Sequence, residues 1–209
     1  MPIPRLAFLL TLCASPALAE TVTTVPATLT APPAEWLGPV PHLVIMGKAK
    51  GHDLNIQIDD MAKAADVAEF AGKREYLPQD GGGYRYGDFE VSLKAVIDGA
   101  ERAFELEFEN HDLHGLTLPA ALALTTENFP KGEAAFLEFS MEWETGAGSV
   151  NEELGGYSGT LSLLQDQGTP DGKGLLPDGM IGGHVVAEKD GETVVISFTV
   201  PVAEYEIDD

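Results

Sequence analysis

Apolar and polar residues alternate along most of the chain after residue 42, which is the period of a β-strand with one buried face. The clearest examples are FELEFEN, residues 104–110, and FLEFSMEWE, residues 136–144, where large apolar residues take every second position. The same alternation recurs in residues 53–59, 86–97, 157–164 and 192–202. We therefore predict a mainly β fold of about eight or nine strands, since such segments are bounded by glycine and proline clusters.

The alternation also predicts which side chains face the core. The predicted inward rows are Leu54, Ile56 and Ile58; Phe89, Val91, Leu93, Ala95 and Ile97; Leu137, Phe139, Met141 and Trp143; Leu161 and Leu163; and Val194, Ile196, Phe198 and Val200. One buried and one wet face is typical of antiparallel sheets, so we expect a single antiparallel β-sandwich, with a closed β-barrel as the alternative. Asp98-Gly99 and Asp190-Gly191 predict tight hairpin turns.

Residues 60–71, DMAKAADVAEFA, are the exception to the β pattern and predict one short helix. Asp60 is a suitable N-cap residue, the alanines favour helix, and Gly72 is placed to end it.

The chain divides into three segments by composition. Residues 1–19 predict a secretory signal peptide, because Arg5 precedes an apolar run and Ala17-Leu18-Ala19 fits the small-x-small cleavage rule. Residues 20–41 are rich in proline and threonine and predict an extended linker. Residues 42–209 form the predicted β domain. We expect a periplasmic or extracellular protein that contains no disulfide, since the single cysteine, Cys13, lies in the signal peptide.

The chain is strongly acidic, with 34 Asp and Glu against 12 Lys and Arg and a formal charge of −22. Such a field repels nucleic acid and anionic surfaces, so we exclude nucleic acid as a partner. It favours solubility and attracts cations and basic proteins. No later segment of the sequence is apolar enough to predict a transmembrane helix.

Two rows of glutamates follow from the alternation: Glu105, Glu107 and Glu109 in the first, and Glu138, Glu142 and Glu144 in the second. Neighbours within a row stand about 7 Å apart along a strand. Two unit charges at that distance repel by only ~0.6 kcal/mol in water, and salt screens them further. We therefore expect a solvated face. A divalent cation is the one cofactor considered, held loosely, because strand backbones offer few carbonyls to complete a calcium shell.

A metal site is a second hypothesis. His111, Asp112 and His114 follow the first glutamate row, and folding would have to bring in His52, Asp53 or His184. Imidazole and carboxylate are ligands for zinc or copper. The spacing matches no strong metal signature, so the alternative is a polar turn in which Asn110 or Asp112 bonds locally.

Tyrosines suggest a third candidate site. Tyr76, Tyr84 and Tyr86 cluster around the DGGG loop, and Tyr157 is a further candidate. Tyrosine-rich loop tips bind sugars or partner proteins by stacking, whereas the alternative is packing over one end of the fold. The long acidic loop that follows carries Asp166, Asp171 and Asp178 and predicts a flexible turn more than a calcium loop.

The motifs do not favour an enzyme. The chain has no G-x-S-x-G elbow, phosphate loop or dinucleotide fingerprint, and its carboxylates are too numerous to single out a catalytic pair. We expect a non-enzymatic binding or structural module whose ligand is a cation, a sugar or a basic protein. The alternatives are a barrel that carries a lipid or small apolar ligand, and a metal-binding protein or metal-dependent hydrolase. Neither the oligomeric state nor the ligand follows from the sequence.

Overall fold

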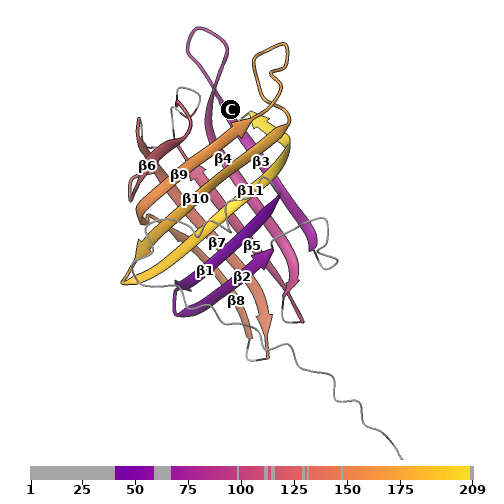
Figure 1. Ribbon diagram of the computed structural model, residues 1–209, viewed down its shortest axis with the longest axis vertical. Helices are drawn as coiled ribbons and strands as arrows, with labels where there is room; N and C mark the ends of the chain where they lie inside the picture. Colours follow the sequence, from indigo (N-terminus) through magenta and orange to yellow (C-terminus); the bar gives the residue numbers. More distant parts are fainter. Residues whose placement is uncertain are drawn as a thin grey trace, which may run out of the picture.

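The predicted mainly β fold is confirmed (Figure 1). The computed structural model describes residues 41–58, 67–97, 99–110, 113, 116–128, 130, 132–146 and 148–207. Eleven strands account for most of this part of the chain, and it contains no α-helix.

The strands follow the alternating segments closely. The first six are His42–Ala49 (β1), His52–Ile58 (β2), Val67–Pro78 (β3), Tyr84–Ile97 (β4), Ala100–Glu109 (β5) and Ala120–Thr125 (β6). The other five are Ala134–Thr145 (β7), Gly148–Gly155 (β8), Ser158–Gln167 (β9), Gly179–Lys189 (β10) and Glu192–Ile207 (β11).

Hydrogen-bonded pairs link all eleven strands into one sheet. Their order is β10-β9-β6-β7-β5-β4-β3-β11-β1-β2, with β8 beside β7. Because β10 also pairs with β11, the path from β11 through β3, β4, β5, β7, β6, β9 and β10 returns to its start. Such a ring of pairings occurs in closed barrels and in sandwiches whose strands pass from one sheet to the other at the corners.

The sheet is mixed rather than wholly antiparallel, which corrects the prediction. β11 runs parallel to β3, and β6 runs parallel to β7, while the remaining pairs are antiparallel. The alternation of apolar residues determines which side chains face the core. It carries no information about the direction of the neighbouring strand, so this error could not be avoided from the pattern.

The predicted inward rows form the core. Most of their members are almost fully buried, and the interior is filled by aromatic rings. Phe89 stacks on Phe108 with ring centroids 4.8 Å apart, and Phe198 lies 5.6 Å from Phe108. This part of the interior therefore resembles an ordinary packed core rather than the hollow lumen of a carrier.

The predicted helix over residues 60–71 is wrong for residues 67–71, the part of it that the structure describes. Residues 67–71 open β3, whereas residues 60–66 lie outside the described residues. Ala71 pairs with Ser92 of β4, so sheet hydrogen bonds override the helix preference of alanine. Gly72 does not end a helix. It lies against the core, where an added Cβ would stand 2.8 Å from a methyl group of Val202.

The hairpin turns are as predicted. Asp190 and Gly191 have φ angles of 54° and 81°, the positive values that a two-residue type I′ turn requires. Gly99 also has a positive φ, of 77°, between the paired residues Ile97 and Ala100. Asp98 lies outside the described residues.

The predicted signal peptide and residues 20–40 of the predicted linker lie outside the described residues, so these segments stay predictions. No helix in the described part of the chain has the length and apolar character that crossing a membrane requires.

Candidate functional site

The glutamate rows lie on the side of the sheet opposite to the core. Glu107 pairs with Glu90 on one side and with Glu138 on the other, while its strand neighbours Leu106 and Phe108 are buried. We call the part of this surface around Glu107 the acidic face. Its acidic members on β3, β4, β5 and β7 are Glu75, Asp88, Glu90, Glu105, Glu107, Glu109 and Glu138.

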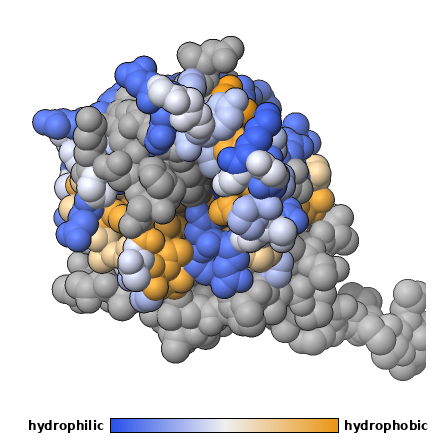
Figure 2. All heavy atoms as spheres, turned by 90° about the horizontal axis from the view of Figure 1, so that it is seen from above, coloured by the Kyte–Doolittle hydropathy of each residue, from blue (hydrophilic) through white to orange (hydrophobic). Residues whose placement is uncertain are grey.

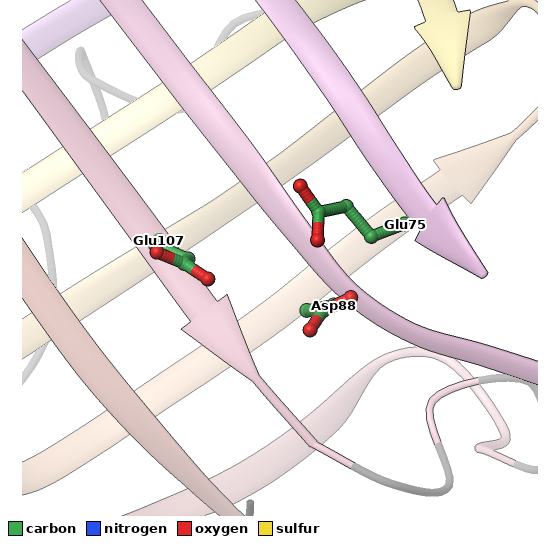
Figure 3. Close-up of side chains that lie close together, drawn as sticks. All are labelled: Glu75, Asp88 and Glu107. Carbon is green, nitrogen blue, oxygen red and sulfur yellow. The ribbon is translucent and has the colours of Figure 1, made fainter. Parts of the chain in front are cut away.

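Three carboxylates of the acidic face converge. Glu75, Asp88 and Glu107 each offer an oxygen, and these oxygens all lie within 4.8 Å of one another. Figure 3 shows the side chains on three neighbouring strands, with an oxygen of Glu75 and of Glu107 directed toward Asp88. Two oxygens bound to one Ca²⁺ at 2.3–2.6 Å stand at most about 5 Å apart. The triad could therefore hold a metal ion.

The sequence analysis missed the triad because it considered each strand alone. Along a strand, equivalent side chains are about 7 Å apart, but neighbouring strands are separated by only about 4.8 Å. Glu75 is paired directly with Asp88, and Glu107 lies diagonally across from Asp88 on the next strand. The alternation of residues 69–75 and 86–90 could have indicated that Glu75 and Asp88 face away from the core. Only the register between the strands places these carboxylates together.

The prediction of a uniformly solvated row is wrong in part. Glu105 is exposed, Glu107 is half-buried, and Glu109 is only 7% exposed. Burial, followed by the charges of Glu109 and Glu75, raises the pKa of Glu107 to about 7. Partial desolvation, followed by the charge of Glu153, raises the pKa of Glu138, and although Glu105 remains exposed, partial desolvation and the charge of Glu90 raise its pKa as well. The carboxylates thus repel one another in a partly desolvated region of the acidic face.

Lys73 compensates part of this charge. Its Nζ lies 2.6 Å from Glu75, 3.1 Å from Glu206 and 3.5 Å from Glu90. Although partial burial disfavours the ammonium ion, hydrogen bonds to Glu75 and Glu206 raise the pKa of Lys73. Within the triad, Lys73 thus pairs with Glu75, whereas no ion pair of the described residues includes Glu107.

The pKa of Glu107 predicts a pH dependence of stability. In the unfolded chain this carboxyl ionises near 4.5, whereas in the folded protein its pKa is about 7. Between these values the folded state binds more protons, so the free energy of unfolding should fall as pH rises from 5 to 8. Urea denaturation with a chelator present measures this slope. Glu107→Gln should flatten it, and Glu144→Gln, which removes an exposed glutamate elsewhere, should not. Parallel profiles for all three proteins would contradict the assignment.

A separate pocket of about 320 Å³ lies where β3 and β9 end and β4 begins. The connections from β3 to β4 and from β9 to β10 rise from this same end of the molecule (Figure 1). Figure 2 looks onto it and shows apolar and hydrophilic surface bordering a hollow. We call this pocket of about 320 Å³ the end pocket. Its lining residues are Tyr76, Tyr84, Leu113, Leu116, Leu118, Leu163, Asp166, Gly174, Leu175 and Leu176.

The structure brings together two of the four tyrosines that the sequence analysis proposed as a ligand site. Tyr76 and Tyr84 both line the end pocket. Tyr157 lies elsewhere, where Lys189 Nζ stands 5.7 Å from its ring centroid and burial raises its pKa to about 12. The side chain of Tyr86 lies outside the described part of the structure.

Arg74, which the sequence analysis did not single out, is fully buried beside the end pocket. It donates two hydrogen bonds to one oxygen of Asp166, at 3.2 Å from Nε and 2.8 Å from Nη2. The guanidinium donates three further hydrogen bonds, to the backbone carbonyls of Gln167, Leu176 and Asp178. All five donors of the guanidinium are thereby used.

The acidic loop between β9 and β10 is shaped by hydrogen bonds to its own carboxylates. Asp171 accepts hydrogen bonds from the backbone N–H groups of Lys173 and Leu175, at 2.7 and 2.9 Å. Asp178 accepts one from Thr169 N–H at 2.9 Å. These carboxylates are engaged in shaping the loop, and the loop's Leu175 is buried in the core.

The predicted histidine metal site stays a prediction, because most of its residues, His111, Asp112 and His114, lie outside the described part of the structure. His52 contacts Trp143 edge-to-face, with ring centroids 5.4 Å apart. Trp143 pairs with Arg102, so this contact lies near the start of β5. Asn110 follows the other end of β5, about 26 Å from Arg102 at the rise per residue of a β-strand. The side-chain Nδ2 of Asn110 donates to the carbonyls of Gly132 and Ala134.

His184 also stands apart from His52. Its Nδ1 lies 3.1 Å from the carbonyl oxygen of Ile196, and burial lowers its pKa. His184 pairs with Ser197 on the face opposite to Ile196, whereas His52 pairs with the core residue Ala49. The two imidazoles therefore point to opposite faces of the sheet and cannot share one ion.

The chain matches no protein-family model, and no curated protein and no solved structure is detectably similar to it. The geometry of the acidic face and of the end pocket is therefore the basis for any functional conclusion.

Proposed function

We propose that this protein is an exported, non-enzymatic binding module whose acidic face holds a divalent cation, with Ca²⁺ as the ligand. The observation that carries the proposal is the convergence of Glu75, Asp88 and Glu107 within 4.8 Å. The raised pKa of Glu107 supports it, because a bound cation would offset the burial and the repulsion that disfavour the ionised carboxylate.

The ligand atoms favour Ca²⁺ over softer metals. Carboxylate oxygens suit Ca²⁺, Mg²⁺ and Mn²⁺, whereas zinc and copper prefer imidazole and thiolate. Three side chains on a sheet leave several positions of the coordination shell to water, because the strand carbonyls are used in hydrogen bonds between strands. Ca²⁺ tolerates such irregular shells better than Mg²⁺, which demands near-ideal octahedral geometry. We expect a dissociation constant on the order of 10⁻³ M, as in weak extracellular modules.

The serine–histidine geometry on the described strands supports a non-enzymatic role. His42 Nε2 lies 3.0 Å from Ser197 Oγ, the spacing of a base and a nucleophile. Both residues are buried, however, with exposures of 6% and 1%. A nucleophile must meet its substrate, so we attribute this pair to packing of polar groups within the fold.

Calcium is expected to stabilise the protein at pH 8. At 10 mM and a dissociation constant of about 1 mM, the free energy of unfolding rises by about 1.4 kcal/mol, which is about 3–6 °C in melting temperature. Thermal melts with 10 mM CaCl₂ and with a chelator measure the shift. Glu107→Gln should remove most of it, whereas Glu144→Gln should keep it.

Sodium chloride at matched ionic strength is the control for general screening. If it raised the melting temperature as much as CaCl₂ does, the acidic face would be a screened surface without a site. The same conclusion would follow if Glu107→Gln and Glu75→Gln retained the full calcium shift.

A further inference from the structure

We propose that the end pocket is a second binding site, for a small uncharged molecule with an apolar body and one hydrogen-bond donor. The site is separate from the acidic face. The triad faces away from the core, whereas the pocket is lined by residues that point into the end of the ring, such as Leu163. The inference therefore does not depend on cation binding.

The walls of the pocket determine the body of the ligand. Six of the lining residues are leucines, from β9, from the segment after β5 and from the β9–β10 loop. A volume of about 320 Å³ lies at the lower end of small-molecule sites and suits roughly ten to fifteen non-hydrogen atoms. Long acyl chains exceed this size, and below the pocket the stacked rings of Phe89 and Phe108 fill the interior.

The hydrogen-bond donor is inferred from Asp166. Both bonds from Arg74 go to the same oxygen, Oδ1. Among the described residues, no hydrogen bond reaches Oδ2, although the side chain is only 11% exposed and lines the pocket. A carboxylate oxygen that is open to the pocket at an apolar wall favours a ligand that donates a hydrogen bond, since charged acceptors form the stronger bonds.

The same network excludes an anionic ligand. The only cation buried at the pocket is Arg74 among the described residues, and its five donors are all used within the protein. Inside the pocket a ligand carboxylate would meet Asp166 with no uncommitted buried cation among the described residues, in a chain whose formal charge is −22. Fatty acids are thus disfavoured by charge as well as by size.

The pocket is formed before a ligand arrives. Tyr76 Oη accepts a hydrogen bond of 2.8 Å from Leu176 N–H, and Arg74 holds the carbonyl of the same leucine. Leu175 is buried beside them. At the rim, Tyr84 is 36% exposed, and Lys173 Nζ lies 5.9 Å from its ring centroid. A pocket whose loop is already ordered loses little conformational entropy on binding.

The test uses 2-naphthol as the probe, with 2-methoxynaphthalene as the matched compound that lacks the donor. Calorimetry or equilibrium dialysis of the full chain should give a dissociation constant on the order of 10⁻⁵ to 10⁻⁴ M for 2-naphthol. The ether should bind at least about tenfold more weakly. Equal affinities would overturn the role of Asp166, and no saturable binding below about 1 mM would overturn the site.

Two variants locate the binding. Leu116→Trp fills the pocket from a half-buried position and should weaken 2-naphthol at least about tenfold. Leu164→Trp is the matched control, because Leu164 is 41% exposed and next to Leu163 on the opposite face of β9. Asp166→Asn should abolish the preference for the naphthol over its ether. Equal losses in both tryptophan variants would place the probe outside the pocket and overturn the proposal, with melting curves confirming that each variant is folded.

Discussion

Replacing Arg74 with methionine is expected to lower the free energy of unfolding by about 3–5 kcal/mol. The guanidinium is fully buried and makes five hydrogen bonds, to one oxygen of Asp166 and to three backbone carbonyls. Methionine leaves the carboxylate of Asp166 buried without its cation and leaves the carbonyls unpaired. An isolated buried charge costs more than the pair contributed, which is why the expected loss is large.

Urea denaturation of the wild type and of Arg74→Met measures this loss. The matched control is Lys94→Met, which breaks a pair with Glu101 at 3.2 Å between largely exposed side chains and should cost under about 1 kcal/mol. The double variant Arg74→Met/Asp166→Leu should recover part of the stability, because the unpaired carboxylate is then gone. If Arg74→Met cost no more than Lys94→Met, the buried network would not hold the β9–β10 loop as described.

Replacing Phe198 with alanine should cost a similar amount, about 3–5 kcal/mol. Its ring lies 5.6 Å from that of Phe108 and 5.9 Å from that of Phe89, and its exposure is only 1%. Removal of the ring loses apolar burial and leaves a cavity that the neighbouring rings on β4 and β5 cannot fully close.

The unfolding free energy of Phe198→Ala is compared with that of Val96→Ala, a truncation at a side chain that is 48% exposed. The surface change should cost less than about 0.5 kcal/mol. A small loss for Phe198→Ala would indicate a loosely filled interior and would reopen the carrier hypothesis, in which the inward rows line a cavity.

The functional candidates differ in how far a single strand reveals them. Glu107 was predicted as part of an outward row, and that orientation is confirmed. Its partner carboxylates, Glu75 and Asp88, come from two other strands, so their approach depends on register across the sheet. Tyr76 and Tyr84 were predicted as neighbours because only a short loop separates them, and both line the end pocket. The leucines that complete the pocket come from segments about 40 and 100 residues further on.

By itself the sequence determined the β class, most of the inward rows, the hairpin turns at residues 98–99 and 190–191, and the outward rows of glutamate. These features are local, since the period of two assigns each side chain to a face whichever strand lies alongside. Only the tertiary structure decided that β3 is a strand from Val67, that two strand pairs run parallel, and that Arg74 is buried with Asp166. Direction, register and ring closure depend on contacts between distant segments, and a pattern with a period of two is the same for every register that keeps the faces.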